Sequence, residues 1–419
     1  MNEFFESRGI IFKIKELKDF SFILIDCDRG LIQTIYSGKL PAELKEQGSI
    51  AFRGKWVSAK VKDEFVSEKN FELQLEKVVV LSTPLEAMPF DITKKELNIN
   101  NDILFDYRAL SMRHPKQKAI FKLQEGIVRG FREFFYQEGF TEIRTPKIVK
   151  SGAEGGANIF ELNYFGEKAY LTQSPQFYKE FLAGVFQKVF EIGPVFRAEK
   201  HNTNRHINEY TSMDIEFGPI NNFEEIMEIE ESLLKFIIRF LKGNYSFELN
   251  LLEVQLPEIT NIPRIKFLDA KKLLSEKFKM NDEDDLSPAE ELKLCEYFLD
   301  NEKSEFLFVT HYPESKRPFY AMNSKTENKM TESFDLLFRG IEITTGGQRI
   351  HELNELEEKM KCRNMNLEMF EFFTNAHRYG LPPHGGFGMG LERLTQKLIG
   401  LGNVKEATMF PRDISRLTP

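Results

Sequence analysis

Residues 196–217 read FRAEKHNTNRHINEYTSMDIEF and predict a charged hairpin, two arms joined by a polar loop. Arg197 and Arg205 flank this loop, and the following strand carries Asp214 and Glu216 on one face because alternate strand residues point the same way. Guanidinium groups bind phosphate oxygens through two parallel hydrogen bonds, so the arrangement suits a polyphosphate. Solvated Arg–Glu pairs would account for the same residues, and the hairpin alone leaves both interpretations open.

A glycine-rich stretch near the C-terminus, HGGFGMGLER at 384–393, places Arg393 at the start of a helix. It has neither the Gly-Lys-Ser/Thr of a Walker loop nor the spacing and βαβ context of a dinucleotide fingerprint. Its glycines predict a tight turn with positive φ. They would also let a flat ring approach the backbone, while Arg393 could reach a phosphate.

Hard oxygen ligands gather in FDLLFRGIEITTGGQRIHE, residues 334–352. Asp335, Glu342 and the hydroxyl of Thr345 are the donor types that hold Mg²⁺ against phosphates. An exposed strand pair would explain any one of these residues, but it explains the set less well.

Two neighbouring stretches, SGAEGGANIF at 151–160 and YLTQSPQFYKE at 170–180, complete the candidate site. Glu154 stands in a glycine-rich loop, whereas Gln176 and Lys179 lie near the end of a strand. A lone lysine is usually a solvated surface charge, and the residues alone favour that interpretation. In a pocket, Lys179 would instead select an anionic group of a substrate.

The N-terminal ninety residues read as strands. Segments such as FSFILID (20–26) and GLIQTIY (30–36) are β-branched or aromatic, partly alternating, and separated by short turns such as DRG (28–30). Five or so short strands in this length predict a small barrel, of which the OB-fold is a common form.

The rest of the chain predicts a large mixed α/β domain. Helical spacing of apolar residues predicts helices over 116–138, 223–242, 352–379 and 390–400. The predicted organisation is a barrel over 1–92, a polar hinge over 93–115, and an α+β domain over 116–419 with a charged helical insertion at about 264–305.

Composition limits the protein class. The 419 residues contain 57 Lys and Arg against 65 Asp and Glu, a net charge of −8, which disfavours a general polyanion-coating protein but leaves a local nucleic-acid site open. Three scattered cysteines, Cys27, Cys295 and Cys362, indicate neither a zinc site nor a disulfide framework. The charged N-terminus and the lack of long apolar runs predict a cytoplasmic protein without a membrane segment.

Taken together and in this order, SGAEGG, QSPQFYK, FRAEKHNTNRH, EITTGGQRIH and HGGFGMGLER resemble the class II aminoacyl-tRNA synthetases of subclass b. The chain looks most similar to aspartyl-tRNA synthetases of the archaeal and eukaryotic type, along essentially its whole length. The resemblance implies an N-terminal OB-fold that binds the anticodon. It also implies a catalytic domain with an antiparallel sheet flanked by helices and ATP bound in a bent form.

The resemblance implies an ATP site and a Mg²⁺ site. Arg197 should contact the α-phosphate and the aspartate carboxyl, and Glu199 should lie near the adenine or the incoming tRNA end. The implied ATP contacts are Arg197, Ala198, Glu199, Arg205, His206, Ile207, Glu342, Gly390, Leu391, Glu392 and Arg393, of which Arg197, Glu199 and Arg393 are the implied catalytic residues. Mg²⁺ is implied at Glu342 and Thr345, with Asp335 as a further acidic contact.

The family's aspartate pocket maps onto Glu154, Gln176, Phe177, Tyr178, Lys179, Arg197, Asp214, Thr345 and Arg349. Lys179 and Arg349 should bracket the side-chain carboxylate, and Asp214 should receive the α-amino group. Two cations that read one carboxylate penalise asparagine, which offers no charge. Asparaginyl enzymes usually lack the lysine after QS-Q, so Lys179 discriminates between the two.

The implied reaction is aspartate–tRNA ligation by a homodimer, with Pro146 at the dimer interface and tRNA(Asp), ATP and L-aspartate as partners. Phe22 and Gln33 match positions that read the middle anticodon base. Charging of tRNA(Asn) as well is the working hypothesis, although neither Phe12 nor the Thr83-Pro84 turn offers a decisive residue. The alternatives are an asparaginyl-tRNA synthetase, a tRNA-independent synthetase paralogue and a catalytically inactive RNA-binding module.

Overall fold

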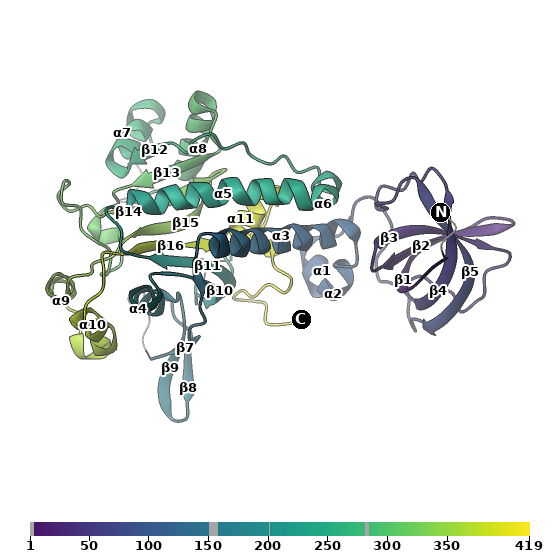
Figure 1. The fold of residues 1–419 in the computed structure, drawn as a ribbon, viewed down its shortest axis with the longest axis horizontal. Coiled ribbons are helices and arrows are strands. Elements are labelled where there is room, and N and C mark those ends of the chain that lie inside the picture. Colours follow the sequence, from purple (N-terminus) through teal and green to yellow (C-terminus); the bar gives the residue numbers. More distant parts are fainter. Residues whose placement is uncertain (1–3, 151–157, 201, 281–284) are drawn as a thin grey trace. The chain divides into compact units, whose positions relative to one another are not determined.

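The computed structural model of the chain forms two compact units (Figure 1). It describes residues 4–150, 158–200, 202–280 and 285–419. The first unit comprises residues 1–119 with 250–253 and Pro419, and the second comprises 120–249 and 254–418. The division falls at 119/120, four residues after the expected boundary at 115/116.

The first unit contains a closed five-stranded barrel, so the expected small barrel is confirmed. Its strands, in the order β1-β2-β3-β5-β4, are β1 (Phe4–Glu16), β2 (Phe20–Cys27), β3 (Gly30–Ser37), β5 (Phe71–Ser82) and β4 (Ser49–Ser58). Only β3 and β5 pair in parallel. Alternate β2 residues, Ile23 and Ile25, fill the barrel core, which leaves Phe22 on the outer face.

The segment expected to be a polar hinge carries two short helices, α1 (Asn101–Asp106) and α2 (Arg108–Ser111). Asn100 starts the first of them because its side chain accepts a hydrogen bond from the backbone N–H of Ile103 at 2.9 Å. The two helices have only 6 and 4 residues, too few for a helical spacing of apolar residues to stand out in the sequence.

The second unit is organised around an eight-stranded sheet with the order β12-β13-β14-β15-β16-β11-β10-β6. The strands are β6 (Thr141–Glu142), β10 (Lys188–Phe196), β11 (Glu209–Phe217), β12 (Arg264–Lys266), β13 (Phe306–Thr310), β14 (Ser333–Phe338), β15 (Ile341–Gln348) and β16 (Gly385–Gly390). The central pairs are antiparallel, and only the outermost strands β6 and β12 pair in parallel. A second sheet has the order β7-β9-β8, built from β7 (Ile148–Val149), β8 (Glu161–Tyr164) and β9 (Glu167–Leu171). The expected antiparallel sheet is confirmed.

The helices that accompany this sheet are α3 (Pro115–Gln137), α4 (Gln176–Phe186), α5 (Glu224–Asn244), α6 (Ser246–Leu251), α7 (Phe267–Phe278), α8 (Pro288–Glu302), α9 (Leu353–Cys362), α10 (Glu371–Arg378) and α11 (Leu391–Ile399). The long helices α3 and α5 lie side by side (Figure 1), where a Cβ on Gly126 would stand 2.6 Å from Leu241. Glycine at this position therefore allows their close approach. Among the described residues, none of the helices is both long and apolar enough to span a membrane.

The structure corrects three local expectations. The predicted glycine-rich turn at 384–390 is the extended strand β16, and none of the glycines in it has a positive φ. The helix expected over 352–379 is broken into α9 and α10 by the segment 363–370, which ends in the 3-10 turn Leu367–Phe370. The strand pair β14–β15 is largely buried rather than exposed, since it lies in the middle of the sheet.

Candidate active site

A cavity of about 880 Å³ lies within the second unit, against strands β11, β15 and β16. Residues from the hairpin, the oxygen-rich stretch, the QSPQFYKE stretch and the glycine-rich strand all line it, although they are far apart in sequence. The expected site residues in its wall are Gln176, Lys179, Arg197, Glu199, Arg205, His206, Ile207, Asp214, Glu342, Thr345, Arg349, Gly390, Glu392 and Arg393.

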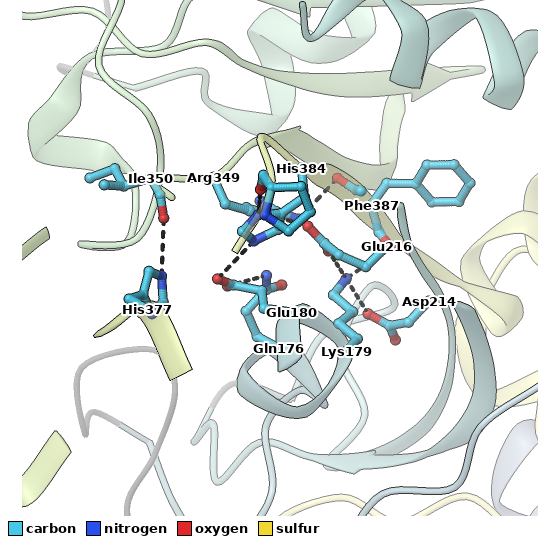
Figure 2. Close-up of polar contacts among 12 residues, drawn as sticks. Gln176, Lys179, Glu180, Asp214, Glu216, Arg349, Ile350, His377, His384 and Phe387 are labelled. Carbon is cyan, nitrogen blue, oxygen red and sulfur yellow. Dashed lines mark hydrogen bonds and ion pairs between the residues drawn. The ribbon is translucent and has the colours of Figure 1, made fainter. Parts of the chain in front are cut away.

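One end of the cavity holds two buried cations (Figure 2). Lys179 on α4 is only 2% exposed, so the interpretation as a solvated surface charge is wrong. Its Nζ donates to Asp214 Oδ1 at 2.9 Å and to the carbonyl oxygen of Phe387 at 3.1 Å. Arg349, which follows β15, donates through Nε to Glu216 Oε1 at 3.0 Å and through Nη2 to the carbonyl oxygen of Gly386 at 2.9 Å.

Glu216 connects these two cations, a role that sequence reasoning missed. Its Oε2 lies 3.4 Å from Lys179 Nζ, while Oε1 accepts from Arg349. Burial alone raises the pKa of Glu216, but the nearby charges of Arg349, Lys179 and His384 outweigh it and hold the pKa below its ordinary value. The available signal was its position two residues after Asp214, on the same strand face.

The hairpin brings Arg197 to the cavity at the end of β10. The backbone N–H of Arg197 donates to the carbonyl oxygen of Asn208 at 2.9 Å, and the Asn208 side chain returns a bond to the Arg197 carbonyl at 2.6 Å. These bonds fix the root of the loop. The guanidinium lies 4.0 Å from Glu199 Oε1, and His206 Nε2 lies 3.6 Å from Glu199 Oε2. Glu199 therefore stands between two of the expected ATP contacts.

The helical insertion supplies an unexpected partner for Arg205. Its Nη2 donates to Glu291 Oε2 on α8 at 2.6 Å and to the Gly340 carbonyl oxygen at 2.8 Å. Burial, followed by the charge of Glu342, raises the pKa of Glu291 to about 7 despite Arg205 and Arg393. Nothing in the acidic insertion sequence marked Glu291 as a site residue.

The start of α11 closes the cavity. Arg393 Nη1 donates to the Glu342 carbonyl oxygen at 3.0 Å and lies 3.7 Å from Glu342 Oε1. Glu392 accepts from the Thr211 backbone N–H at 3.0 Å, which joins α11 to β11, and burial raises the pKa of Glu392 to about 7. Leu391 packs in the core instead of lining the cavity.

The expected Mg²⁺ ligands lie together on β14 and β15. Asp335 pairs with Thr345 in the strand register, and Thr345 Oγ1 donates to Glu342 Oε1 at 3.0 Å. Asp335 lies 2.8 Å from Arg317 Nη2, yet burial and the charge of Glu342 raise its pKa. The described residues contain no cluster of three or more His, Cys, Asp and Glu side chains that could hold a metal. Two carboxylates and a hydroxyl suit Mg²⁺, which usually takes its remaining ligands from water and phosphates.

The remaining expected residues that the structure describes lie outside the cavity wall. Glu154 falls outside the described residues, and Asp335 lies behind the cavity-lining residues. Phe177 packs into an aromatic cluster with Phe373, at 4.5 Å between ring centroids. Ala198 contributes a backbone N–H bond to the Asn158 carbonyl at 2.7 Å. Tyr178 on α4 is also absent from the wall.

Phe22 and Gln33 lie on one outer face of the barrel. The register pairs Phe22 with Ile35 and Gln33 with Leu24, so both side chains project from the same side. Phe22 is half-buried and packs edge-on against Phe20 at 5.2 Å, while Gln33 Nε2 donates to Glu72 Oε2 at 2.6 Å. This face offers an aromatic ring beside an amide.

Three comparisons place the chain among known proteins. The family model "tRNA synthetases class II (D, K and N)" matches residues 100–414. The aspartate–tRNA(Asp/Asn) ligase of Deinococcus radiodurans is 43% identical, covering 98% of this chain and 95% of that protein. The aspartate–tRNA(Asp) ligase of Pyrococcus abyssi is 39% identical, with 98% and 95% covered. The structure of asparaginyl-tRNA synthetase from Pyrococcus horikoshii complexed with asparaginyl-adenylate matches with a TM-score of 0.89 at 28% identity, covering 100% of this chain and 96% of that one.

Proposed function

The chain belongs to the class II tRNA synthetases of the D, K and N group, as its motifs predict, and from this premise we propose that it is an aspartate–tRNA ligase. It activates L-aspartate with ATP to aspartyl-adenylate and pyrophosphate, then transfers the aspartyl group to the terminal ribose of tRNA(Asp). One observation carries the choice of aspartate. Two buried cations, Lys179 and Arg349, face the same cavity as the arginines of the hairpin.

The cation end of the cavity selects the amino acid. Within the described residues, the hydrogen bonds of Arg349 use Nε and Nη2, which leaves Nη1 for a ligand carboxylate. Lys179 faces the same carboxylate from α4, and Asp214 receives the α-amino group. Asparagine would leave both cations without a charged partner in a buried site, and that costs binding energy.

Arg197 and Arg393, which also line the cavity, bind the phosphates of ATP. The α-carboxylate of aspartate attacks the α-phosphate, and pyrophosphate leaves with the electrons of the broken P–O bond. None of the side chains acts as a nucleophile, so rate enhancement comes from positioning and from positive charge beside the phosphates. Glu342 and Thr345, backed by Asp335, would hold Mg²⁺, which supplies further charge compensation when bound.

The tRNA specificity and the oligomer extend this proposal. We infer that the enzyme charges tRNA(Asn) as well as tRNA(Asp), since the Deinococcus relative named for both tRNAs is 43% identical and the Pyrococcus relative named for tRNA(Asp) is 39% identical. Phe12 packs against Phe65 in the barrel unit at 6.0 Å and does not face outwards, whereas Thr83 is exposed. The exposed Thr83 is therefore the candidate contact for the third anticodon base. The active form is a homodimer that uses the surface around the exposed Pro146.

Amino-acid-dependent exchange of pyrophosphate into ATP tests the activation step, and charging of purified tRNAs tests the transfer step. We expect exchange with aspartate and little with asparagine, together with charging of tRNA(Asp) and tRNA(Asn). Exchange driven by asparagine would identify an asparaginyl enzyme, and exchange without tRNA charging a tRNA-independent paralogue. Absence of exchange with either amino acid would indicate an RNA-binding module. Failure to charge tRNA(Asn) alone would restrict the specificity to tRNA(Asp).

A further inference from the structure

A second, fully buried pair of charged groups lies beside the two cations of the cavity (Figure 2). Glu180 follows Lys179 on α4, and His384 immediately precedes β16. Both side chains are 0% exposed, and neither lines the cavity. The aspartate pocket described above does not use them.

Hydrogen bonds determine where the protons of this pair reside. Nδ1 of His384 lies 2.8 Å from the Pro382 carbonyl oxygen, and a carbonyl oxygen only accepts, so Nδ1 carries a proton. Nε2 lies 3.2 Å from Glu180 Oε2, while Gln176 Nε2 donates to Glu180 Oε1 at 2.7 Å. Nε2 and Glu180 therefore share one further proton, which makes the ring an imidazolium when it resides on nitrogen.

The electrostatic surroundings favour the imidazolium. Burial by itself lowers the pKa of His384, but the hydrogen bond and charge of Glu180, together with the charge of Glu216, raise it above its ordinary value.

The same pair is tied to both cations that face the substrate. The His384 carbonyl oxygen accepts from the backbone N–H of Arg349 at 2.9 Å. Glu180 is the sequence neighbour of Lys179 on α4. The hydrogen bond between His384 and Glu180 therefore joins the two segments that hold Arg349 and Lys179.

The charges at this end balance only if the His384–Glu180 pair keeps the proton that its two members share. The buried groups are three cations, Lys179, Arg349 and His384, and three carboxylates, Glu180, Asp214 and Glu216. Without this proton the group would carry one excess negative charge. Buried charges are weakly screened, so this excess would oppose a ligand carboxylate while leaving a neutral amide almost unaffected.

We propose that His384 is a positioning residue for aspartate specificity, which compensates Glu180 and thereby keeps the charges of Lys179 and Arg349 available to the substrate carboxylate. This role rests on the proposed function and adds a determinant that the cavity wall does not contain. The role of His384 is to balance the charge of Glu180. If His384 is lost, removal of the Glu180 charge should therefore restore the specificity for aspartate, whereas a packing defect would remain.

The test compares His384→Gln with the double variant Glu180→Gln/His384→Gln in pyrophosphate exchange. In His384→Gln, we expect the ratio of kcat/KM for aspartate over asparagine to fall by about tenfold or more, chiefly through KM for aspartate, because one buried unit charge is unbalanced. KM for ATP should stay unchanged. The double variant regains balance with two cations and two carboxylates, so its ratio should return towards that of the unmodified enzyme.

Two matched variants make the result decisive. His377 is also buried, but its ring nitrogens face the backbone carbonyl oxygens of Phe373 and Ile350 at 3.1 Å each, so His377→Gln should leave the aspartate/asparagine ratio unchanged (Figure 2). Glu180→Gln alone should also change the ratio little, since His384 can lose its proton and restore balance. If His384→Gln fails to fold, Glu180→Gln still tests the proposal. A tenfold fall in the aspartate/asparagine ratio of Glu180→Gln would overturn it.

The outcomes separate this inference from the proposed function. Aspartate-dependent exchange by the unmodified enzyme supports the function independently of His384. An unchanged ratio in His384→Gln would overturn the charge-balance role alone. A double variant with a ratio as low as that of His384→Gln would also overturn it, since that result would indicate packing. If the unmodified enzyme shows no exchange with aspartate, the proposed function itself fails.

Discussion

Lys179 illustrates how burial changes the chemistry of a single residue. In solvent its ammonium would be an ordinary hydrated charge, but in the structure it is enclosed with Asp214 and Glu216. Removing an ammonium from water is expensive unless partners compensate it, so its carboxylate neighbours stabilise the buried position. The same enclosure makes the Lys179 ammonium selective for a carboxylate, because a ligand must supply a negative charge in place of the water that the ammonium has lost.

At the residue scale, the first prediction concerns Arg197. We expect Arg197→Ala to reduce aspartate-dependent pyrophosphate exchange by roughly 10²-fold or more, the typical loss when one preorganised donor to a developing charge is removed. Arg264→Ala is the control, since Arg264 is exposed on β12 at the edge of the sheet. Full activity in Arg197→Ala would refute its assignment to the phosphates.

A second residue-scale prediction concerns Glu230, buried on α5 near Thr344 and Asp335. Burial raises its pKa to about 8, so the folded protein keeps a proton that the unfolded chain releases above its ordinary pKa of 4.5. This proton contributes its whole stabilisation below the ordinary pKa. As the pH rises from there to about 8, the free energy of unfolding falls by about 1.4 kcal/mol per pH unit.

Glu230→Gln removes this dependence on pH. The unfolding free energy of the variant, relative to that of the unmodified protein, should therefore increase between pH 5 and pH 8. Urea denaturation at several pH values measures it. Glu228→Gln, an exposed change on the same helix, should show no such trend. A constant difference for Glu230→Gln would mean that the carboxyl is already ionised in the folded protein.

At the element scale, the strand β16 shows why glycines recur without a turn. At Gly385, Gly386 and Gly388, the missing side chain leaves room for a neighbouring strand or a charged group that approaches the backbone. A Cβ on Gly386 would stand 2.0 Å from the Ile215 carbonyl oxygen and 2.6 Å from Glu216 Oε2. The repeated glycines therefore let the central strand pack directly beside the carboxylates of the pocket.

We accordingly expect Gly386→Ala to destabilise the protein by about 1–3 kcal/mol and to weaken aspartate activation, because the added methyl displaces the neighbouring strand. Thermal or urea unfolding and pyrophosphate exchange measure the two effects. Gly243→Ala is the matched control on α5, where an added Cβ meets nothing within 4 Å. It should stabilise by about 0.5–1 kcal/mol through helix propensity. Equal effects of the two changes would contradict the close-approach explanation.

At the scale of the whole molecule, the proposed chemistry and the proposed RNA recognition belong to different units. The cavity and its charged residues lie in the second unit, whereas Phe22 and Gln33 lie in the first. An overall acidic chain can still bind tRNA in this way, because aromatic stacking and a few placed arginines do not need a basic surface.

This division predicts that Phe22→Ala weakens tRNA charging and spares amino-acid activation. Stacking of one base is worth about 1–3 kcal/mol, so kcat/KM for tRNA should fall about 5- to 150-fold. Pyrophosphate exchange without tRNA should be unchanged. Phe4→Ala serves as the control, since Phe4 is 47% exposed on the barrel beneath Arg53 and Lys55. An equal loss in both variants would show that Phe22 has no specific contact.

The family, the barrel, the long helices and most of the charged residues of the cavity wall can be predicted from the sequence alone. These features follow from short motifs and local periodicity, which can be recognised without knowledge of the fold. Phe22 and Gln33 also follow from motif position, although their RNA contacts remain a prediction.

The pairing of the charges arises only when the chain is folded. Lys179 meets Asp214 across 35 positions, and His384 meets Glu180 across 204, so no local pattern encodes either bond. The extended form of β16 likewise depends on its neighbours β11 and β15, which supply its hydrogen bonds. Burial and long-range partners set the charge state and role of these side chains, and both arise only when the chain is folded.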